Sequence, residues 1–254
     1  MIHARWWRDL SVRMRIGGMT ALLVLLVLNV FVVPFSVAPD DTLARLLRDV
    51  FLTLILLSGV VAVAEDRTHW IAIALVAAVA MLVNWTGWFL PPGQTPGLTD
   101  ATTLVSLAIL GAVIGVKVFS GGTVTFDRIL GAVTLYILIG VVWAQAYQIV
   151  SFHVPHAYAG NTGADGAFDS PTAIYFSFVT LTTVGYGDIT PVAHAAKSLA
   201  IVEGLLGQLY PAIVLARLVS LQTAAPAAPA DGTANPASPS RRSGRKGSRT
   251  RSRP

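Results

Sequence analysis

The stretch TLTTVGYGDITP, from Thr180 to Pro191, places two glycines, a tyrosine and an acid between two long apolar runs. The segment leading into it, SPTAIYFSFVTLTT, has the form of a short helix. Ser170 can cap the free amides of a first turn, and Pro171 suits the first helical position. About 12 helical residues span roughly 18 Å, which reaches only about halfway across a bilayer core. If the surrounding chain is membrane-embedded, this helix must enter and turn back.

Composition indicates that the chain is membrane-embedded. It has 254 residues, of which 54% are hydrophobic and 12% charged, and a mean hydropathy of +0.66. These values are far too apolar for an ordinary soluble domain and predict an integral membrane protein. The absence of cysteine excludes disulfides, thiolate metal sites and a cysteine nucleophile. The net charge of +5 reflects basic residues clustered at the C-terminus, so we do not expect nucleic-acid binding.

Six apolar runs are close to the length of about 20 residues that a transmembrane helix needs. They cover about residues 16–37, 49–64, 70–90, 101–119, 129–150 and 192–220. The first run could instead be a cleaved signal peptide, because SVA before Pro39 resembles a cleavage site. A retained helix is favoured, because the run is longer than a usual signal core. The predicted fold is an all-α membrane protein with six transmembrane helices. The short re-entrant helix and the loop that follows it lie between helices five and six.

Basic residues in short loops predict the orientation of these helices. Four arginines between residues 5 and 15 place the N-terminus in the cytoplasm, and six spans place the C-terminus there too. Residues 151–191 contain no lysine or arginine and are expected outside. Arg45 and Arg48 are exceptions, because the hydropathy pattern puts them in the first external loop.

The residues Thr183-Val184-Gly185-Tyr186-Gly187, followed by Asp188, match the selectivity-filter signature of potassium channels. The order of outer helix, half-length helix, filter and inner helix resembles that family over about residues 128–220. The resemblance implies a homotetramer around one pore, with K⁺ as the permeant ion, no cofactor, and localisation to a bacterial plasma membrane. Together with hydropathy and composition, it divides the chain into an N-terminal four-helix region, a pore domain and a basic cytoplasmic tail, which are residues 1–127, 128–221 and 222–254.

The residue types of the filter suit the dehydration of K⁺. A row of backbone carbonyls can replace the ion's water, and we expect K⁺ at the carbonyls of residues 183–186. Gly185 and Gly187 permit positive φ angles that turn successive carbonyls to one side. The Thr183 hydroxyl can extend the row, and Val184 and Tyr186 are expected to point away from the axis. In the resembling family the acid after the filter often bonds an aromatic of the pore helix, which makes Tyr175 the hypothetical partner of Asp188.

Acidic residues of the external segment suit cation conduction. Asp165, Asp169 and Asp188 would form rings of negative charge at the outer mouth of a tetramer. Solvated turn residues are an equally good interpretation of the first two.

The sixth apolar run contains residues that weaken or charge a helix. Gly207 lies where members of the resembling family carry a gating hinge, and Gly204 and Pro211 also favour bending. Helix packing is the alternative for Gly204. Glu203 is the one acid in this run, and a structural role, bonded to Gln208 or a backbone group within the tetramer, is favoured over attraction of cations.

Several features concern regulation. The fourth run contains no arginine and only Lys117, so we expect no voltage sensor and weak voltage dependence. His153, His156 and His194 are candidates for pH sensing, although ordinary interfacial roles are more common. The tail, rich in proline, alanine and serine, predicts disorder, with contact of its basic cluster to anionic lipid as the alternative.

The favoured function is therefore a passive potassium-selective channel. A non-conducting or weakly selective membrane sensor with a pore-like fold is the alternative. A potassium-uptake transporter subunit is disfavoured, because those chains carry four pore repeats. No P-loop, paired carboxylates or metal-ligand motif indicates an enzyme.

Overall fold

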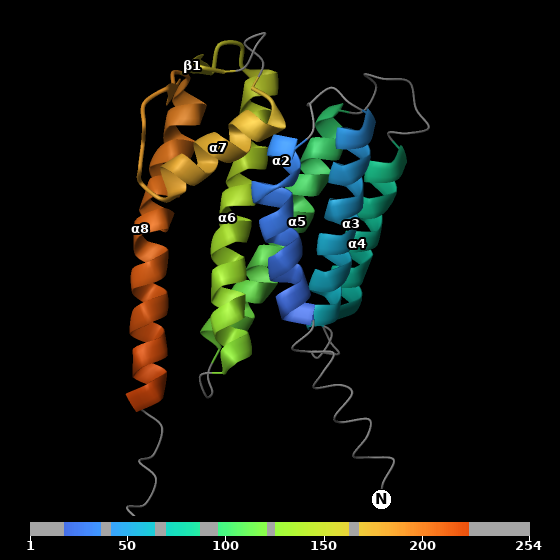
Figure 1. The fold of residues 1–254 in the computed structure, drawn as a ribbon, viewed down its shortest axis with the longest axis vertical. Coiled ribbons are helices and arrows are strands. Elements are labelled where there is room, and N and C mark those ends of the chain that lie inside the picture. The colour runs from blue at the N-terminus through green and yellow to red at the C-terminus, as the bar shows by residue number, and fades with distance from the viewer. Residues whose placement is uncertain are drawn as a thin grey trace, which may run out of the picture.

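The computed structural model describes residues 18–36, 42–63, 70–86, 96–120, 125–162 and 168–223. Long helices run side by side along the long axis, and the short helix α7 lies obliquely at one end (Figure 1). The elements are a helix over Gly18–Phe31, α2 (Val33–Ser36), α3 (Thr42–Val63), α4 (Trp70–Thr86), α5 (Pro96–Phe119), α6 (Phe126–His153), β1 (Tyr158–Gly160), α7 (Ser170–Leu181), β2 (Ile189–Pro191) and α8 (His194–Thr223).

A helix lies on each of the six apolar runs. Within the described residues, three are long and apolar enough to cross a membrane, namely Thr99–Phe119, Phe126–His153 and His194–Ser220. The helices over Gly18–Phe31 and Ala74–Trp85 are apolar but shorter.

The start of α3 differs from the hydropathy prediction. Arg45 and Arg48 lie in its first two turns and not in a loop. The sequence LARLLR explains the difference, because leucine, alanine and arginine all favour helix and the arginines leave a leucine face intact.

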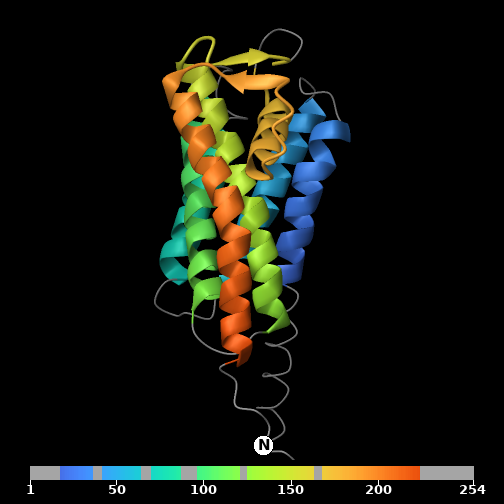
Figure 2. The same ribbon diagram turned by 90° about the vertical axis from the view of Figure 1, so that its left-hand side faces the viewer.

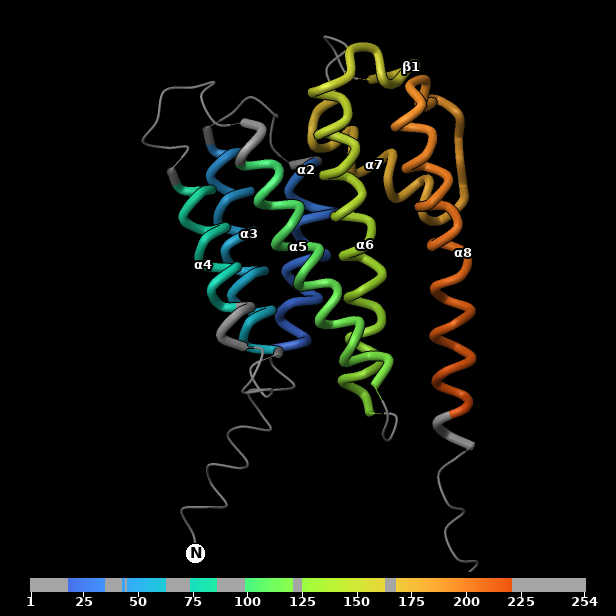
Figure 3. The backbone as a smooth tube through the Cα atoms, turned by 180° about the vertical axis from the view of Figure 1, so that it is seen from behind, coloured from blue at the N-terminus to red at the C-terminus, as the bar shows by residue number. Residues whose placement is uncertain are grey.

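The helix α6 packs against other helices on two sides. On one side α6 contacts α5, where Leu107, Leu110 and Ile114 are buried together with Leu135 and Leu138 of α6. On its other side α6 contacts both α7 and α8, and α7 also contacts α8 (Figure 3). The α6 helix therefore joins the N-terminal helices to the unit that carries the TVGYG sequence.

The helix α7 is fixed at both ends. Asp169 is its N-cap, and its Oδ1 accepts a hydrogen bond from the Thr172 amide at 2.9 Å. The expectation that Ser170 caps the helix was therefore wrong by one residue; Asp and Ser are similarly good caps, so composition did not distinguish them. Near the other end, the Phe178 ring packs against Gly140, where an added Cβ would lie 2.8 Å from the ring. Phe178 also contacts Phe31, with ring centroids 5.7 Å apart.

A two-stranded antiparallel sheet closes the end of the molecule at which α7 begins (Figure 2). Its register pairs Tyr158 with Pro191 and Gly160 with Ile189. Gly160 has φ +108°, and an added Cβ would lie 2.0 Å from the Asp188 carbonyl oxygen, so only glycine fits there. The sheet ties the chain that follows the TVGYG sequence to the chain that follows α6.

Candidate pore-loop site

The chain reverses direction immediately after α7. The Thr183 amide donates to the Thr180 carbonyl at 2.9 Å, and the amides of Val184 and Gly185 both donate to the Val179 carbonyl, at 3.0 and 3.2 Å. These bonds satisfy carbonyls that the end of a helix otherwise leaves without partners. The TVGYG residues therefore begin from a fixed point on α7.

Positive φ angles recur at every second residue of the TVGYG sequence. Thr183, Gly185 and Gly187 have φ of 59°, 55° and 79°, whereas Val184 and Tyr186 keep negative φ. The prediction of positive φ at the two glycines is confirmed. The prediction did not include Thr183, and a β-branched residue in this region is unusual. The side chains of Val184 and Tyr186 are 52% and 72% exposed in the single chain.

The far end of the loop is held by a side chain and by the sheet. The Tyr175 hydroxyl donates to Asp188 Oδ2 at 2.8 Å, which is the contact proposed from the sequence. The Asp188 carbonyl accepts from the Asn161 amide at 2.9 Å. The loop between Thr183 and Asp188 is thus anchored before and after its glycines.

A buried polar cluster lies between α6, α7 and α8, and consists of Tyr147, Ser177 and Glu203. Glu203 is fully buried, and its Oε2 accepts a hydrogen bond from the Tyr147 hydroxyl at 2.5 Å. Its Oε1 is bonded to Ser177 Oγ, also at 2.5 Å. The prediction of Gln208 or a backbone group as the partner of Glu203 was wrong, because both carboxyl oxygens bond side chains of α6 and α7. Polar residues inside apolar runs usually find one another, and this rule was the available signal for Tyr147 and Ser177.

The number of hydrogens in this cluster is informative. The Ser177 hydroxyl has one hydrogen. Its oxygen lies 2.7 Å from the Gly140 carbonyl and 2.5 Å from Glu203 Oε1, and both are acceptors when the glutamate is ionised. Both contacts are satisfied at once only when a second proton lies between Ser177 and Glu203. The geometry therefore fits a neutral carboxyl group.

The predicted hinge residues lie in different surroundings along α8. At Gly207, an added Cβ would lie 1.8 Å from the Leu181 carbonyl oxygen, so this glycine allows α8 to approach the end of α7. Gly204 has nothing within 4 Å of such an atom. Pro211 lies inside α8 and lacks the amide that would bond the Gly207 carbonyl four residues before. Their role in gating stays a prediction.

Two remaining predictions concern charge. Asp169 serves as the cap of α7, a role not expected from its sequence position, and the choice between an acidic ring and a solvated turn stays open. Asp165 and the basic residues of the tail lie outside the described residues.

At the sheet, Tyr158 stacks on Phe168 with ring centroids 4.1 Å apart, and burial raises the pKa of the Tyr158 hydroxyl. That hydroxyl donates to the Tyr147 carbonyl at 3.3 Å and so joins the sheet to α6.

Comparison with known proteins relates the sequence of this region to ion channels. Residues 133–223, which contain most of α6, α7, the TVGYG loop and α8, match the family model described as Ion channel. The chain is 36% identical over 83 residues to Two pore potassium channel b of Oryza sativa subsp. japonica. These matches support a potassium-channel family for this region. They point away from an enzyme.

Other relatives of this channel region are bacterial. Protein LctB of Bacillus caldotenax is 28% identical over 122 residues, which are 46% of this chain and 90% of that protein. Protein LctB of Geobacillus stearothermophilus is 47% identical over 47 residues, 18% of this chain and 34% of that protein. The match to the rice channel covers 32% of this chain and 21% of that protein. No solved structure matches the chain.

Proposed function

We propose that four copies of this chain form a potassium-selective channel that conducts K⁺ passively. The alternation of φ sign at Thr183, Gly185 and Gly187 carries the proposal. In an ordinary strand successive carbonyls point to opposite sides, whereas alternating backbone handedness turns them toward the same side. A row of carbonyls on one side can replace the water shell of K⁺, so residues 183–187 form the filter.

The uncovered surface of the single chain supports a tetramer. Val184 and Tyr186 are exposed, and no other part of the described chain covers them. Many large apolar side chains of α8 are also exposed, including Ile201 at 65% and Leu205 at 56%. Four chains around one axis would cover the filter side chains with neighbouring subunits and leave the remaining α8 surface to the neighbours and to lipid.

We infer an arrangement of six membrane spans with α7 re-entrant between the last two. Both termini are cytoplasmic in the cell membrane, and the sheet faces outward. At 12 residues, α7 is too short to cross a bilayer, and its start and the sheet lie at the same end of the molecule (Figure 2). Its C-terminal end points into the membrane centre, where the helix dipole favours a cation. The three-part division into residues 1–127, 128–221 and 222–254 belongs to this proposal, as does contact of the basic tail with anionic lipid.

Weak voltage dependence follows from the same arrangement. The helix α5 offers Lys117 as its single basic residue, and this Nζ donates to the Ala62 carbonyl at 2.7 Å. One tethered charge supplies far less than the several gating charges that a voltage sensor moves.

The test is the reversal potential of the purified protein in planar bilayers, with K⁺ on one side and Na⁺ on the other. A reversal near the K⁺ equilibrium potential is expected. Gly185→Ala should abolish it, because alanine at φ +55° is strained. Gly115→Ala is the matched control, since its added Cβ would make only an ordinary 3.5 Å contact with Leu135. A reversal near zero would contradict selectivity, and the absence of any current would favour the non-conducting sensor.

A further inference from the structure

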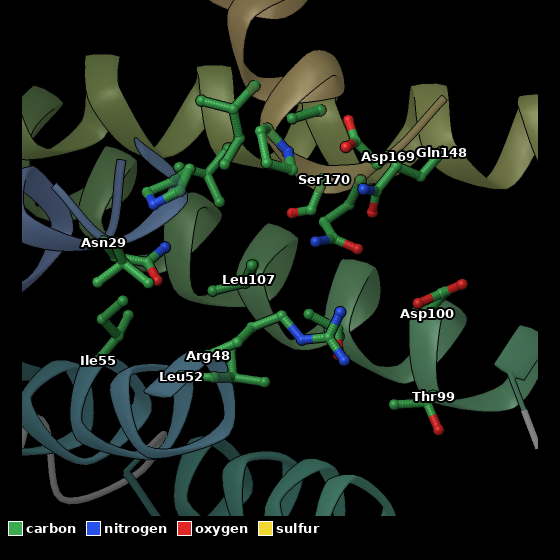
Figure 4. Close-up of a pocket in the computed structure, with 18 of the residues that line it drawn as sticks. Asn29, Arg48, Leu52, Ile55, Thr99, Asp100, Leu107, Gln148, Asp169 and Ser170 are labelled. Atoms are coloured by element: carbon green, nitrogen blue, oxygen red, sulfur yellow. The ribbon is translucent and has the colours of Figure 1, made fainter. Parts of the chain in front are cut away.

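A cavity of about 280 Å³ lies where the N-terminal helices meet the pore-loop unit. Its walls come from α3, α4, α5, α6, the Gly18–Phe31 helix with α2, and the first turns of α7. Figure 4 shows it from the side, with Arg48 and Leu52 of α3 facing Asp169 and Ser170 across the space. The volume suits a small ligand or one end of a larger amphipathic molecule.

One part of the cavity wall is apolar. Leu52, Ile55 and Leu107 are almost fully buried there, and Val141 and Ile174 complete this part from α6 and α7. A hydrocarbon group of a ligand would exchange water for these side chains, which is favourable in proportion to the apolar area it buries.

Another part carries charges of both signs. Arg45 and Arg48 on α3 face the space together with Asp100 on α5 and Asp169 before α7. Figure 4 shows the Arg48 side chain extended into the cavity, with its guanidinium directed toward the side on which Asp100 lies. Arg48 pairs with Asp49 only across 3.8 Å and stays 53% exposed, so its terminal donors remain accessible.

A buried amide also lines the cavity. Asn84 on α4 is 7% exposed, and within the described part of the chain its Nδ2 atom has no hydrogen-bond partner. A buried donor without an acceptor is unfavourable, and an acceptor atom of a ligand would remove that penalty.

We propose that this cavity binds a small zwitterionic group with an apolar tail. Its carboxylate or phosphate oxygens bond Arg48, its ammonium bonds Asp100, and its tail lies on the apolar wall. Two arginines and two aspartates sum to no net charge, so a simple anion or cation would gain one partner and leave an opposite charge unmatched. A free apolar amino acid and a phosphatidylethanolamine head group share this chemistry.

A ligand in the cavity would contact the helix that leads to the pore loop. Ser170, Pro171 and Ile174 belong to the first turns of α7, the helix that ends at the TVGYG residues. A bound ligand would therefore affect conduction through α7. This effect rests on the proposed channel function, whereas the binding itself does not.

The first experiment compares three ligands of the same shape on the full chain in phosphatidylglycerol nanodiscs, by calorimetry. L-leucine carries both charges, 4-methylpentanoate lacks the ammonium, and 3-methylbutylamine lacks the carboxylate. Leucine should bind at least roughly tenfold more tightly than either analogue, because each loses a charge-assisted hydrogen bond. Equal binding of leucine and 4-methylpentanoate would overturn the zwitterion assignment, and this comparison needs no variant.

Two variants then assign the two charges. Arg48→Gln should remove the preference for leucine over 3-methylbutylamine, and Asp100→Asn should remove the preference over 4-methylpentanoate. Lys197→Gln is the control, since it removes an exposed charge on α8 that does not line the cavity. Unchanged preferences in the first two variants would refute the site.

A last arm separates the two sources of the ligand. Replacing phosphatidylglycerol with phosphatidylethanolamine should weaken leucine binding if the lipid head group occupies the cavity, and leave it unchanged if only free zwitterions enter. If leucine does not bind, mass spectrometry of the protein should detect phosphatidylethanolamine that is retained by the wild type and lost with Arg48→Gln and Asp100→Asn. Binding of neither molecule contradicts the proposal. These readouts require no ion current, so a non-conducting chain would leave them intact.

Discussion

The protonation of Glu203 can be tested by replacing its side chain with glutamine. A glutamine side chain offers one acceptor and one donor group, the same pattern that a neutral carboxyl group presents to Tyr147 and Ser177. Glu203→Gln should therefore change the free energy of unfolding by less than about 1 kcal/mol. An ionised glutamate would accept from both hydroxyls, and glutamine would then turn a donor toward the Ser177 hydrogen.

The comparison variant is Glu203→Ala. It removes both contacts to Glu203 Oε atoms, each contributing about 1 kcal/mol, and leaves a cavity in a fully buried place. Together these effects should destabilise the protein by roughly 3–5 kcal/mol, or by about 10 °C in Tm for a chain of this size. Tyr147→Phe isolates one bond, because the ring that packs on Phe176 is kept.

The assay combines thermal unfolding of the purified protein with infrared spectroscopy. The wild type should show the carbonyl band of a protonated carboxyl group, which Glu203→Gln should remove. Glutamine that destabilises as strongly as alanine would refute the neutral assignment, and so would the absence of that band. A fully tolerated Glu203→Ala would instead mean that the cluster contributes little to stability.

Three further predictions concern the pore loop and the helices around it. Gly207→Ala should displace α8 from the end of α7 and abolish K⁺ current in bilayer recordings, whereas Gly204→Ala, whose added Cβ meets nothing within 4 Å in its own chain, should leave the contact between α8 and α7 intact. Asp188→Asn should accelerate inactivation or reduce K⁺/Na⁺ selectivity, measured as currents in K⁺ and in Na⁺ solutions. Tyr175→Phe should have the same effect because it removes the 2.8 Å bond. Unchanged currents in both variants would exclude a supporting role for this bond. Lys117→Gln should leave the shallow slope of the conductance–voltage curve unaltered, and a steep wild-type curve would show that voltage sensing had been missed.

The features predictable from the sequence are those fixed by local chemistry. Hydropathy located the helices because each apolar run has nearly the length of a membrane span. Positive φ at Gly185 and Gly187 followed from residue type alone, and the bond between Tyr175 and Asp188 followed from the family resemblance. Helix boundaries were less predictable: Asp169 and Ser170 are both good caps, and nothing local distinguishes them.

The features that escaped prediction depend on contacts between distant segments. Tyr147 and Ser177 are 56 and 26 residues from Glu203 in the chain, so no spacing rule connects them. The strands of three residues are too short to show an alternating pattern. The cavity joins residues of seven segments, each of which is an ordinary helix residue in its own sequence context.

The strain at Thr183 explains why the loop needs so many anchors. A threonine at φ 59° is less stable than in an ordinary conformation by about 1–2 kcal/mol, and such a residue persists only where its surroundings enforce it. One end of the loop is held by the Val179 carbonyl, and the other by Asp188, through Tyr175 and the sheet. Because both ends are fixed, the loop cannot relax into an extended strand without breaking one of these anchors. Loss of either anchor should therefore release the strained conformation and the row of carbonyls together.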